Sequence, residues 1–413
     1  MRFLTSIIFL TFLTSCKTQK QTHQREFDKQ KDSLTTEIIA LNKNNVFNGF
    51  SVALVNENGT LYQKGFGYSN LQDKILYTQN TIQNIASISK TLVGISLLKA
   101  QELWKLNLDD PINKYLPFKV VNPDFPSNQI TIRQLATHTS SIADNNFYLS
   151  KNYYLKSNQN LKGIKLIFEE EQVFNPADSI VSMEEFLSNV LTENGKWYAK
   201  NAFLNKKPGE QYEYSNVATT LAGYIIQRAS GIPFYEFTKI YILKPLNMKS
   251  SGWRFEDVQF LNYSRLYENP KTVLPYYSTS SYPDGNFITS VNDLSLYLTE
   301  LIKGYNGNGT ILNNESYKTL FTPQLIAKNF VDRNERNPFS ESYNVGIFMG
   351  FGYTGYIGHT GGDPGVSAIM FFNPKNNIGR ILITNTNFVD KIGNDTFYLI
   401  WNKLEKYQDK LSK

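Results

Sequence analysis

The amino-acid sequence predicts a fold of the α+β class, because strand patterns and helical patterns occupy different stretches of the chain. Two short apolar runs near the N-terminal end, residues 50–55 and 61–68, indicate a pair of strands. Helical patterns dominate the middle of the chain. Two further apolar runs, residues 366–372 and 379–385, indicate strands near the C-terminal end.

Composition limits the functions that are open to the chain. Its 413 residues are 41% hydrophobic and 19% charged, which is an ordinary globular composition. The length allows two or three domains, or one large domain that carries an insertion. The net charge of +6 is small for this length, and no basic block with interleaved aromatic residues occurs, so nucleic acid is not expected as a partner.

The N-terminal segment is expected to direct the protein to a membrane. Residues 3–13 are mostly apolar and too few to span a bilayer. The Leu-Thr-Ser-Cys run that follows ends at Cys16, the single cysteine, and resembles the lipobox of a bacterial lipoprotein. We expect residues 1–15 to be a lipoprotein signal peptide and Cys16 to carry a lipid anchor in the cell envelope, on the periplasmic side. The alternative is an ordinary signal peptide followed by an incidental cysteine.

A flexible tether and then a folded domain are expected after the cysteine. Residues 16–31 are polar and mixed in charge, which is typical of a tether. The folded domain is expected over residues 32–413, and residues 33–42 have the apolar spacing of a helix. Asn58-Gly59 lies between the first two strands, and this pair favours a tight hairpin. We therefore expect an antiparallel sheet edge at the start of the domain.

A candidate nucleophile, Ser87, lies where the next helix is expected to begin. A turn-like apolar run leads into residues 84–94, and the helical pattern continues to about Leu103. Lys90 follows three residues after Ser87, and that spacing places both side chains on one helix face. A hydroxyl beside an amine, near the N–H groups of a helix N-terminus, suits attack on a carbonyl. The plain alternative is an ordinary serine in a first helical turn.

The same Ser-x-x-Lys pattern occurs again at Ser96 and Lys99, in the middle of the expected helix. Nine residues rotate a helix by about half a turn, so Ser96 should face away from Ser87. Its hydroxyl is expected to bond back to the preceding turn. Only Ser87 therefore has the position that a nucleophile needs.

The middle of the chain contains the least regular segment. Residues 130–139 indicate a strand followed by a helix, and residues 143–207 are expected to form a partly helical insertion beside the main domain. Within it, residues 182–191 indicate a helix, with Ser182 as the capping residue and Glu185 at the capping-box position. We expect this insertion to line the pocket that determines specificity.

A second pair of candidate residues, Tyr214 and Asn216, precedes a helix expected over residues 217–228. A phenol with a lowered pKa can shuttle protons, and an asparagine amide can orient a substrate amide or a lysine. The same Tyr-Ser-Asn tripeptide also occurs at residues 68–70, so the pattern is weak alone. The plain alternative is a half-buried packing tyrosine.

A third candidate element contains His359, Gly361 and Gly362, just before the strand at residues 366–372. Glycines in a strand let a ligand approach the backbone closely. The N–H group of Gly362 could then donate to an oxyanion. The plain alternative is a histidine in a turn. A final helix is expected over about residues 396–407.

Taken in order, the three elements resemble the serine β-lactamase and penicillin-binding-protein superfamily. They match its motifs S-x-x-K, Y-x-N and K-T-G or H-x-G, in the branch of class C β-lactamases, D-alanyl-D-alanine carboxypeptidases and family VIII-type esterases. The resemblance covers about residues 33–405. Further landmarks are matched by residues 108–111, 130–138, 208–210, 282–286, 290–294 and 359–365.

The resemblance implies a mostly antiparallel β-sheet flanked by helices, with a helical subdomain that holds Tyr214 and a site between the two. Ser87 would be the acylated nucleophile, and Lys90 would activate it. Tyr214 would shuttle protons. Asn216 would hold the substrate amide and Lys90.

The third motif is implied to complete the site around the substrate. The N–H groups of Ser87 and Gly362 would form the oxyanion hole, and Gly361 is the glycine of the motif. His359 would replace the motif's lysine, near the substrate carboxylate or Tyr214. A neutral histidine binds a carboxylate more weakly than a permanent cation does. This departure favours a peptidase, an esterase or another hydrolase over a β-lactamase.

The sequence therefore predicts a serine hydrolase that acts by acyl transfer through a Ser87 acyl-enzyme, without a metal or organic cofactor. The expected substrates are D-amino-acid peptides, esters and β-lactams, in that order. The chain has three histidines and neither a helical histidine pair nor a cysteine cluster, so metal catalysis is disfavoured. His138 is expected to be structural.

The alternative from a different functional class is a non-catalytic lipoprotein on the same scaffold, which would bind the cell wall or act as a receptor. Such a binder would be expected to have lost at least one of Ser87, Lys90 and Tyr214. The complete set favours the enzyme.

Overall fold

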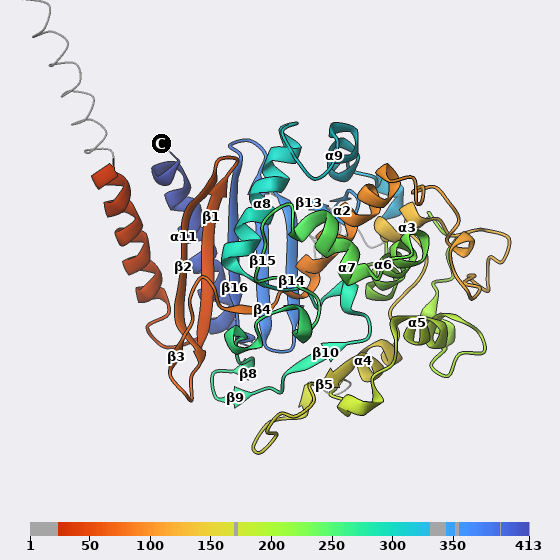
Figure 1. Cartoon of the computed structure of the whole chain (residues 1–413), viewed down its shortest axis with the longest axis horizontal. Helices are drawn as coiled ribbons and strands as arrows, with labels where there is room; N and C mark the ends of the chain where they lie inside the picture. The colour runs from red at the N-terminus through yellow and green to blue at the C-terminus, as the bar shows by residue number, and fades with distance from the viewer. Residues whose placement is uncertain (1–23, 169–171, 331–343, 352–354, 389, 413) are drawn as a thin grey trace, which may run out of the picture.

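The computed structural model describes residues 24–168, 172–330, 344–351, 355–388 and 390–412 (Figure 1). Its centre is an eight-stranded sheet with the order β12-β13-β14-β15-β16-β1-β2-β3, in which every neighbouring pair is antiparallel. Helices cover both faces, and a helical region lies beside it. The α+β fold with an antiparallel sheet and a helical subdomain is therefore confirmed.

The two ends of the chain meet in this sheet. The N-terminal hairpin consists of β1 (Gly49–Asn56) and β2 (Gly59–Asn70), and β1 pairs along its other edge with β16 (Ile378–Thr384). β15 (Val366–Asn373) follows, and then β14 (Ile357–Asp363), which carries the third motif. All four expected strands are confirmed. The C-terminal strands thus bring His359 into the same sheet as the start of the domain.

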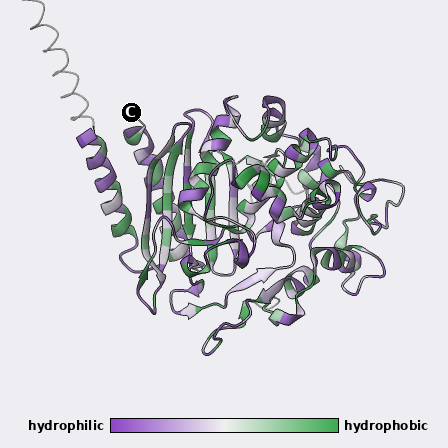
Figure 2. Cartoon of the chain, in the orientation of Figure 1, coloured by the Kyte–Doolittle hydropathy of each residue, from purple (hydrophilic) through white to green (hydrophobic). Residues whose placement is uncertain are grey.

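The sheet is apolar on both faces, as a strand buried between two helical layers must be. Alternate residues of β1 show this. Phe50 and Val52 face a layer made by the helix of residues 24–41 and by α11 (Lys391–Leu411). Ala53 and Val55 face the main core, which includes α8 (Val291–Tyr305) and α2 (Ser89–Glu102). Figure 2 shows the hydrophobic residues concentrated in the strands.

The first helix begins earlier than expected. It covers residues 24–41, so residues 24–31 are helical and do not belong to a flexible tether. Phe27 explains the difference, because it continues the apolar stripe of Leu34 and Ile38 and packs against the same core. The signal peptide, Cys16 and the rest of the expected tether lie outside the described residues. Within the described residues, no helix combines the length and the apolar character needed to cross a bilayer.

The helical subdomain surrounds α2 and α6 (Asn216–Ser230). α3 (Ile132–Ala136) lies beside α6, but the strand expected before it does not form. Instead, Thr131 caps the helix through a capping box with Gln134, and only one isolated bridge joins Thr131 to Pro111. A capping threonine needs an extended backbone, which explains why the pattern suggested a strand.

The segment of residues 143–207 packs onto the main domain. It contains α4 (Asn146–Asn152), β5 (Tyr153–Leu155) and α5 (Met183–Leu191). The expected cap of α5 is confirmed, since the Ser182 hydroxyl accepts a hydrogen bond from the N–H of Glu185. β5 pairs with β10 (Tyr277–Thr279), which joins this segment to the main domain next to the candidate site described below.

Short elements complete the chain. The strands are β3 (Ile75–Leu76), β4 (Ile82–Asn84), β6 (Ile167–Phe168), β7 (Gln172–Val173), β8 (Tyr267–Asn269), β9 (Thr272–Val273), β11 (Ile288–Ser290), β12 (Asn344–Val345) and β13 (Gly350–Phe351). The helices are α7 (Phe234–Thr238) and α9 (Asn314–Phe321).

Candidate active site

Ser87 lies in a sharp turn between β4 and α2. A 3₁₀ turn, Ala86–Ile88, contains it, and α2 begins two residues later at Ser89. Ala86 has a φ angle of 48°, a left-handed conformation that is strained for a residue with a side chain. The turn leaves Ser87 partly exposed, while Lys90 is fully buried beneath it.

Lys90 is held by three acceptors. Its Nζ donates to Ser87 Oγ at 3.1 Å, to Asn216 Oδ1 at 2.7 Å and to the backbone carbonyl oxygen of Asp284 at 2.7 Å. The three contacts fix the amine against the serine hydroxyl. Burial lowers the pKa of Lys90 to about 8, against the opposing field of nearby aspartates. A free amine is therefore accessible close to neutral pH.

The second Ser-x-x-Lys pair behaves as expected of a structural one. Ser96 is fully buried, and its hydroxyl donates to the backbone oxygen of Leu92 at 2.7 Å. Lys99 pairs with Glu102 at 2.8 Å. Ser96 and Lys99 therefore lie away from the site. Both serines are in a Ser-x-x-Lys motif, and what distinguishes Ser87 from Ser96 is its position in the fold.

Asn216 begins α6, and Asp144 fixes its orientation. The carboxylate of Asp144 accepts from the amide Nδ2 of Asn216 at 2.7 Å and from its backbone N–H at 3.0 Å. It also accepts from the backbone N–H of Val217 at 3.0 Å. Asp144 thus satisfies N–H groups of the helix start and leaves Asn216 Oδ1 free to face Lys90.

Tyr214 lies between the lysine and two histidines. Lys90 Nζ is 5.0 Å from its ring centre, and the rings of His138 and His359 are centred 4.6 and 6.2 Å away. Burial raises the pKa of Tyr214 far above its usual value, although interaction with the Ser87 hydroxyl opposes this. Tyr214 therefore carries its proton and is neutral in the resting protein.

The two histidines at the site are also neutral. Burial lowers the pKa of His359 to about 4 and that of His138 well below its usual value, with Lys90 acting in the same direction. His138 is structural, as expected, because its Nδ1 accepts from the backbone N–H of Ser215 at 3.2 Å. His359 lies beside Tyr214 and is absent from the described lining of the cavity. The expected position beside Tyr214 is therefore observed.

Gly361 and Gly362, two neighbouring glycines of β14, have different surroundings. A Cβ atom on Gly361 would lie 2.4 Å from the backbone oxygen of Ile85, so the glycine lets β14 approach the Ser87 turn closely. A Cβ atom on Gly362 would meet no described atom within 4 Å. Gly362 lines the same cavity as Ser87.

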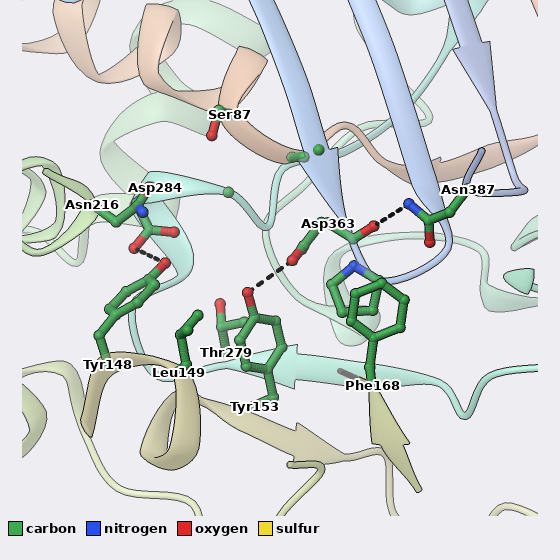
Figure 3. Close-up of a pocket in the computed structure, with 14 residues that line it drawn as sticks. Ser87, Tyr148, Leu149, Tyr153, Phe168, Asn216, Thr279, Asp284, Asp363 and Asn387 are labelled. Carbon is green, nitrogen blue, oxygen red and sulfur yellow. Dashed lines mark hydrogen bonds between the residues drawn. The ribbon is translucent and has the colours of Figure 1, made fainter. Parts of the chain in front are cut away.

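This cavity has a volume of about 330 Å³ and opens over Ser87 (Figure 3). Residues 143–207 contribute to its wall, as expected, through Tyr148, Leu149, Tyr153 and Phe168. Two carboxylates also line it. Tyr148 donates to Asp284 at 3.0 Å, and Tyr153 donates to Asp363 at 2.8 Å.

Sequence reasoning missed three acidic residues of this site, namely Asp144, Asp284 and Asp363. None belongs to a motif, although Asp284 and Asp363 lie in stretches that match family landmarks. In the described parts of the chain, no three His, Cys, Asp or Glu side chains are grouped so that they could hold a metal ion.

A family model described as Beta-lactamase matches residues 34–405. The chain belongs to the beta-lactamase family. Members of this superfamily are in general serine hydrolases that act by acyl transfer, and the site described above contains the groups that such chemistry requires.

Two curated proteins illustrate the likeness within the beta-lactamase family. Protein flp of Staphylococcus aureus (strain MW2) is 24% identical over 350 residues, which cover 82% of this chain and 60% of the relative. The chain thus spans less than two thirds of that relative's length. The putative penicillin-binding protein PbpX of Bacillus subtilis (strain 168) is 27% identical over 364 residues, covering 86% of this chain and 76% of the relative.

Solved structures share the fold. An octameric penicillin-binding protein homologue from Pyrococcus abyssi has a TM-score of 0.65 and 23% identity, covering 92% of this chain and 78% of that one. The D-amino acid amidase from Ochrobactrum anthropi SV3, complexed with L-phenylalanine amide, has a TM-score of 0.64 and 19% identity. The match with this amidase covers 91% of this chain and 99% of the amidase chain.

Proposed function

We propose that this protein is a serine hydrolase in which Ser87 forms the acyl-enzyme. One observation carries the proposal. The Nζ of Lys90 lies 3.1 Å from Ser87 Oγ and is fixed there by Asn216 and the carbonyl of Asp284. A nucleophile and a base within hydrogen-bond reach, with the base oriented by further groups, are what covalent catalysis requires.

The proposed acylation is a proton transfer coupled to attack. Ser87 Oγ bonds to the substrate carbonyl carbon while its proton moves to Lys90 Nζ. The carbonyl oxygen becomes an oxyanion beside the backbone of Ser87 and Gly362. The oxyanion then collapses, the bond to the leaving amine or alcohol breaks, and that group takes a proton through Tyr214. Water or an acceptor amine later releases the acyl group from Ser87.

The pKa values support this division of roles. Lys90 has a pKa of about 8, so it can be a free amine near neutral pH and accept the serine proton. Tyr214 has a pKa far above its usual value, so it starts with its proton. Tyr214 therefore suits a relay that passes the proton from Lys90 to the leaving group.

The proposed substrates are D-amino-acid peptides first, then esters, then β-lactams. A neutral His359 that lies beside Tyr214 offers no permanent cation to a β-lactam carboxylate. The fold shared with a D-amino acid amidase supports placing D-amino-acid substrates first.

The test compares the protein with Ser87→Ala and with Ser96→Ala as the matched control. Each is exposed to a fluorophosphonate and to a fluorescent penicillin, and the intact mass is read. We expect an adduct on wild type and Ser96→Ala and none on Ser87→Ala. Labelling by both probes indicates a peptidase or β-lactamase, and labelling by the phosphonate alone indicates an esterase. If neither probe forms an adduct on folded wild-type protein, the proposal of a serine hydrolase is overturned, and the alternative of a non-catalytic binding protein is favoured.

We also propose that Cys16 anchors the protein to a membrane of the cell envelope after removal of residues 1–15. The proposal rests on the lipobox-like sequence alone, because Cys16 lies outside the described residues. Metabolic labelling with a fatty acid analogue should mark the wild-type protein and not Cys16→Ala. Equal labelling of both, or of neither, would overturn the anchor.

A further inference from the structure

The charges that line the catalytic cavity are acidic. Among the described residues that line it, Asp284 and Asp363 are the two with a carboxylate, and no lysine, arginine or histidine lines the cavity. Lys90 lies behind the wall, with its Nζ bound to Ser87, Asn216 and the carbonyl of Asp284. A substrate carboxylate would therefore find two like charges in the cavity and no cation.

Asp363 is the last residue of β14 and presents its carboxylate to the cavity (Figure 3). One carboxylate oxygen accepts from Tyr153 at 2.8 Å, and the other accepts from the amide of Asn84 at 3.2 Å. A carboxylate has about four acceptor positions, so these neutral donors leave room for a charged one. Burial and the neighbouring Asp284 raise the pKa of Asp363 to about 7, while hydrogen bonds from Tyr153 and Tyr277 and the charge of Lys90 act in the opposite direction.

A second observation at the same place points to a polar ligand. Thr279 is 7% exposed and lines the cavity, and its hydroxyl has no hydrogen-bond partner among the residues that the structure describes. Figure 3 shows this hydroxyl directed into the space between Tyr148 and Tyr153. Buried hydroxyls are rarely left unpaired, so a ligand or solvent atom is expected to fill this position. A hydroxyl oxygen and a carboxylate can both accept hydrogen bonds from one ligand group that carries several donor hydrogens, such as an ammonium group.

From this arrangement we infer that Asp363 and Thr279 form a subsite for a substrate ammonium group, with Asp284 adding negative charge on the far wall. The inference rests on the proposed function, because it assigns the substrate class of the same site. The substrate would be an amide, peptide or ester whose free amino group lies close to the carbonyl that Ser87 attacks. Asp363 is then a specificity-determining residue that binds substrate and takes no part in the proton transfers.

The volume of the cavity limits how far the amine lies from the carbonyl. About 330 Å³ is at the small end for ligand pockets. Because Ser87 and Asp363 line this one small space, a bound molecule that reaches both has few atoms between its carbonyl and its amine. An α-amino acid derivative meets this condition.

The experiment uses three matched ligand sets with the full-length protein. The cationic set is alanine p-nitroanilide in its D and L forms, the neutral set is the same compounds N-acetylated, and the anionic set is the same compounds N-succinylated. We measure kcat/KM for release of p-nitroaniline. We also measure how each ligand slows fluorophosphonate labelling of Ser87, which reports binding without turnover.

For the wild type, the compounds with a free amine should exceed the N-acetylated ones by about 10- to 100-fold, either in kcat/KM or in how well they protect Ser87 from fluorophosphonate labelling. This is the range expected for one hydrogen bond to a charged group. The succinylated compounds should be weakest. Asp363→Asn should remove most of this preference through KM. Within the described part of the chain, Oδ1 of Asn84 has no hydrogen-bond partner. The Asn84 amide can therefore rotate to accept from the new side chain, which favours folding of this variant.

The outcomes separate the two proposals. No fluorophosphonate adduct on wild-type protein overturns the proposed function and, with it, the ammonium subsite. If an adduct forms but the acetylated or succinylated compounds match or exceed the free-amine compounds in kcat/KM and in protection of Ser87, only the ammonium subsite is overturned. An unchanged preference in Asp363→Asn also overturns it. A preference for amines that Asp363→Asn abolishes supports it.

Discussion

The amide of Asn216 donates from Nδ2 to Asp144 Oδ2 across 2.7 Å, and this bond decides which end of the amide Lys90 meets. With Nδ2 committed to the carboxylate, Oδ1 faces Lys90 Nζ at 2.7 Å. The reverse orientation would place an amide donor against an ammonium donor. Asp144 therefore acts as a positioning residue for Lys90, through Asn216.

Asp144→Asn should slow phosphonylation of Ser87 by about 10- to 100-fold, because small displacements of a catalytic group cost rates of this size. The matched control is Asp390→Asn. Asp390 caps α11 by accepting from the N–H of Gly393 at 2.8 Å. The control should lower the free energy of unfolding by about 1 kcal/mol or less and leave the rate unchanged. Equal slowing by both variants would show that only stability is involved.

The rate of Ser87 phosphonylation should rise with pH and level off above a midpoint near 8. Lys90 must lose its proton before it can accept one from Ser87, and burial lowers the pKa of Lys90 to about 8. Lys99→Gln should keep this profile, since Lys99 belongs to the second Ser-x-x-Lys pair. Lys90→Arg should be slow and flat over pH 6–9, because arginine keeps its proton. A midpoint near 10.5 in wild type would contradict the role of Lys90.

Much of the site could be predicted from the sequence, since its motifs are local. Ser87 and Lys90 are three residues apart on neighbouring turns, so spacing alone brings them together. Asp144 could not be found in this way, because its partner Asn216 is 72 residues away. The contact between Asn84 and Asp363 spans 279 residues. Such contacts depend on how the sheet and the helical subdomain pack, which periodicity does not reveal.

The fold was predictable to a similar degree. The apolar strands β1, β15 and β16 are nearly continuous hydrophobic runs, so they were located within one or two residues. The start of the first helix was missed because a single residue, Phe27, extends its buried stripe through a polar segment. The segment at Thr131 was misjudged, since an extended capping residue and a strand have the same backbone conformation.

The ring signals of His138 and His359 should not titrate between pH 6 and 8. Burial lowers the pKa of His359 to about 4 and that of His138 well below its usual value. Proton NMR of the imidazole Cε1–H groups measures this directly, with His138→Gln and His359→Gln to assign the signals. A midpoint near 6.5 for His359 would mean that a cation is available at the third motif after all.

Gly361 and Gly362 of β14 should respond differently to substitution by alanine. Gly361→Ala should lower the free energy of unfolding by about 1–3 kcal/mol, because its Cβ would lie 2.4 Å from the backbone oxygen of Ile85. Gly362→Ala should have little effect on stability, since its Cβ would lie more than 4 Å from every atom of the described residues. Urea unfolding of the two variants checks this. Equal destabilisation by both would mean that β14 does not need its close approach to the Ser87 turn.

Asp363→Asn should stabilise the protein, and by more at pH 8 than at pH 5. The pKa of Asp363 is raised to about 7 in the folded state, so its ionised form destabilises the fold progressively from about pH 4 to pH 7. We expect a difference between the two pH values on the order of 1 kcal/mol in urea unfolding.

The control for this prediction is Asp109→Asn. Because the pKa of Asp109 is lowered and not raised, this substitution should destabilise the protein where Asp363→Asn stabilises it. Arg133 lowers the pKa of Asp109, so its charged form stabilises the fold, and the substitution should destabilise the protein as pH rises through the range where the unfolded carboxyl ionises. The effect should be small because Asp109 is largely exposed. The same pH dependence for both variants would contradict the raised pKa of Asp363.

Lys90 is anchored to residue 284 through the main chain, while the side chain of Asp284 binds Tyr148 and Thr220. A carbonyl acceptor is present whatever amino acid occupies the position. A single codon change at 284 can therefore alter the charge of the cavity and leave the anchor of the amine in place. Preference for one substrate over another can drift during evolution, or be redesigned, without rebuilding the machinery that breaks the bond.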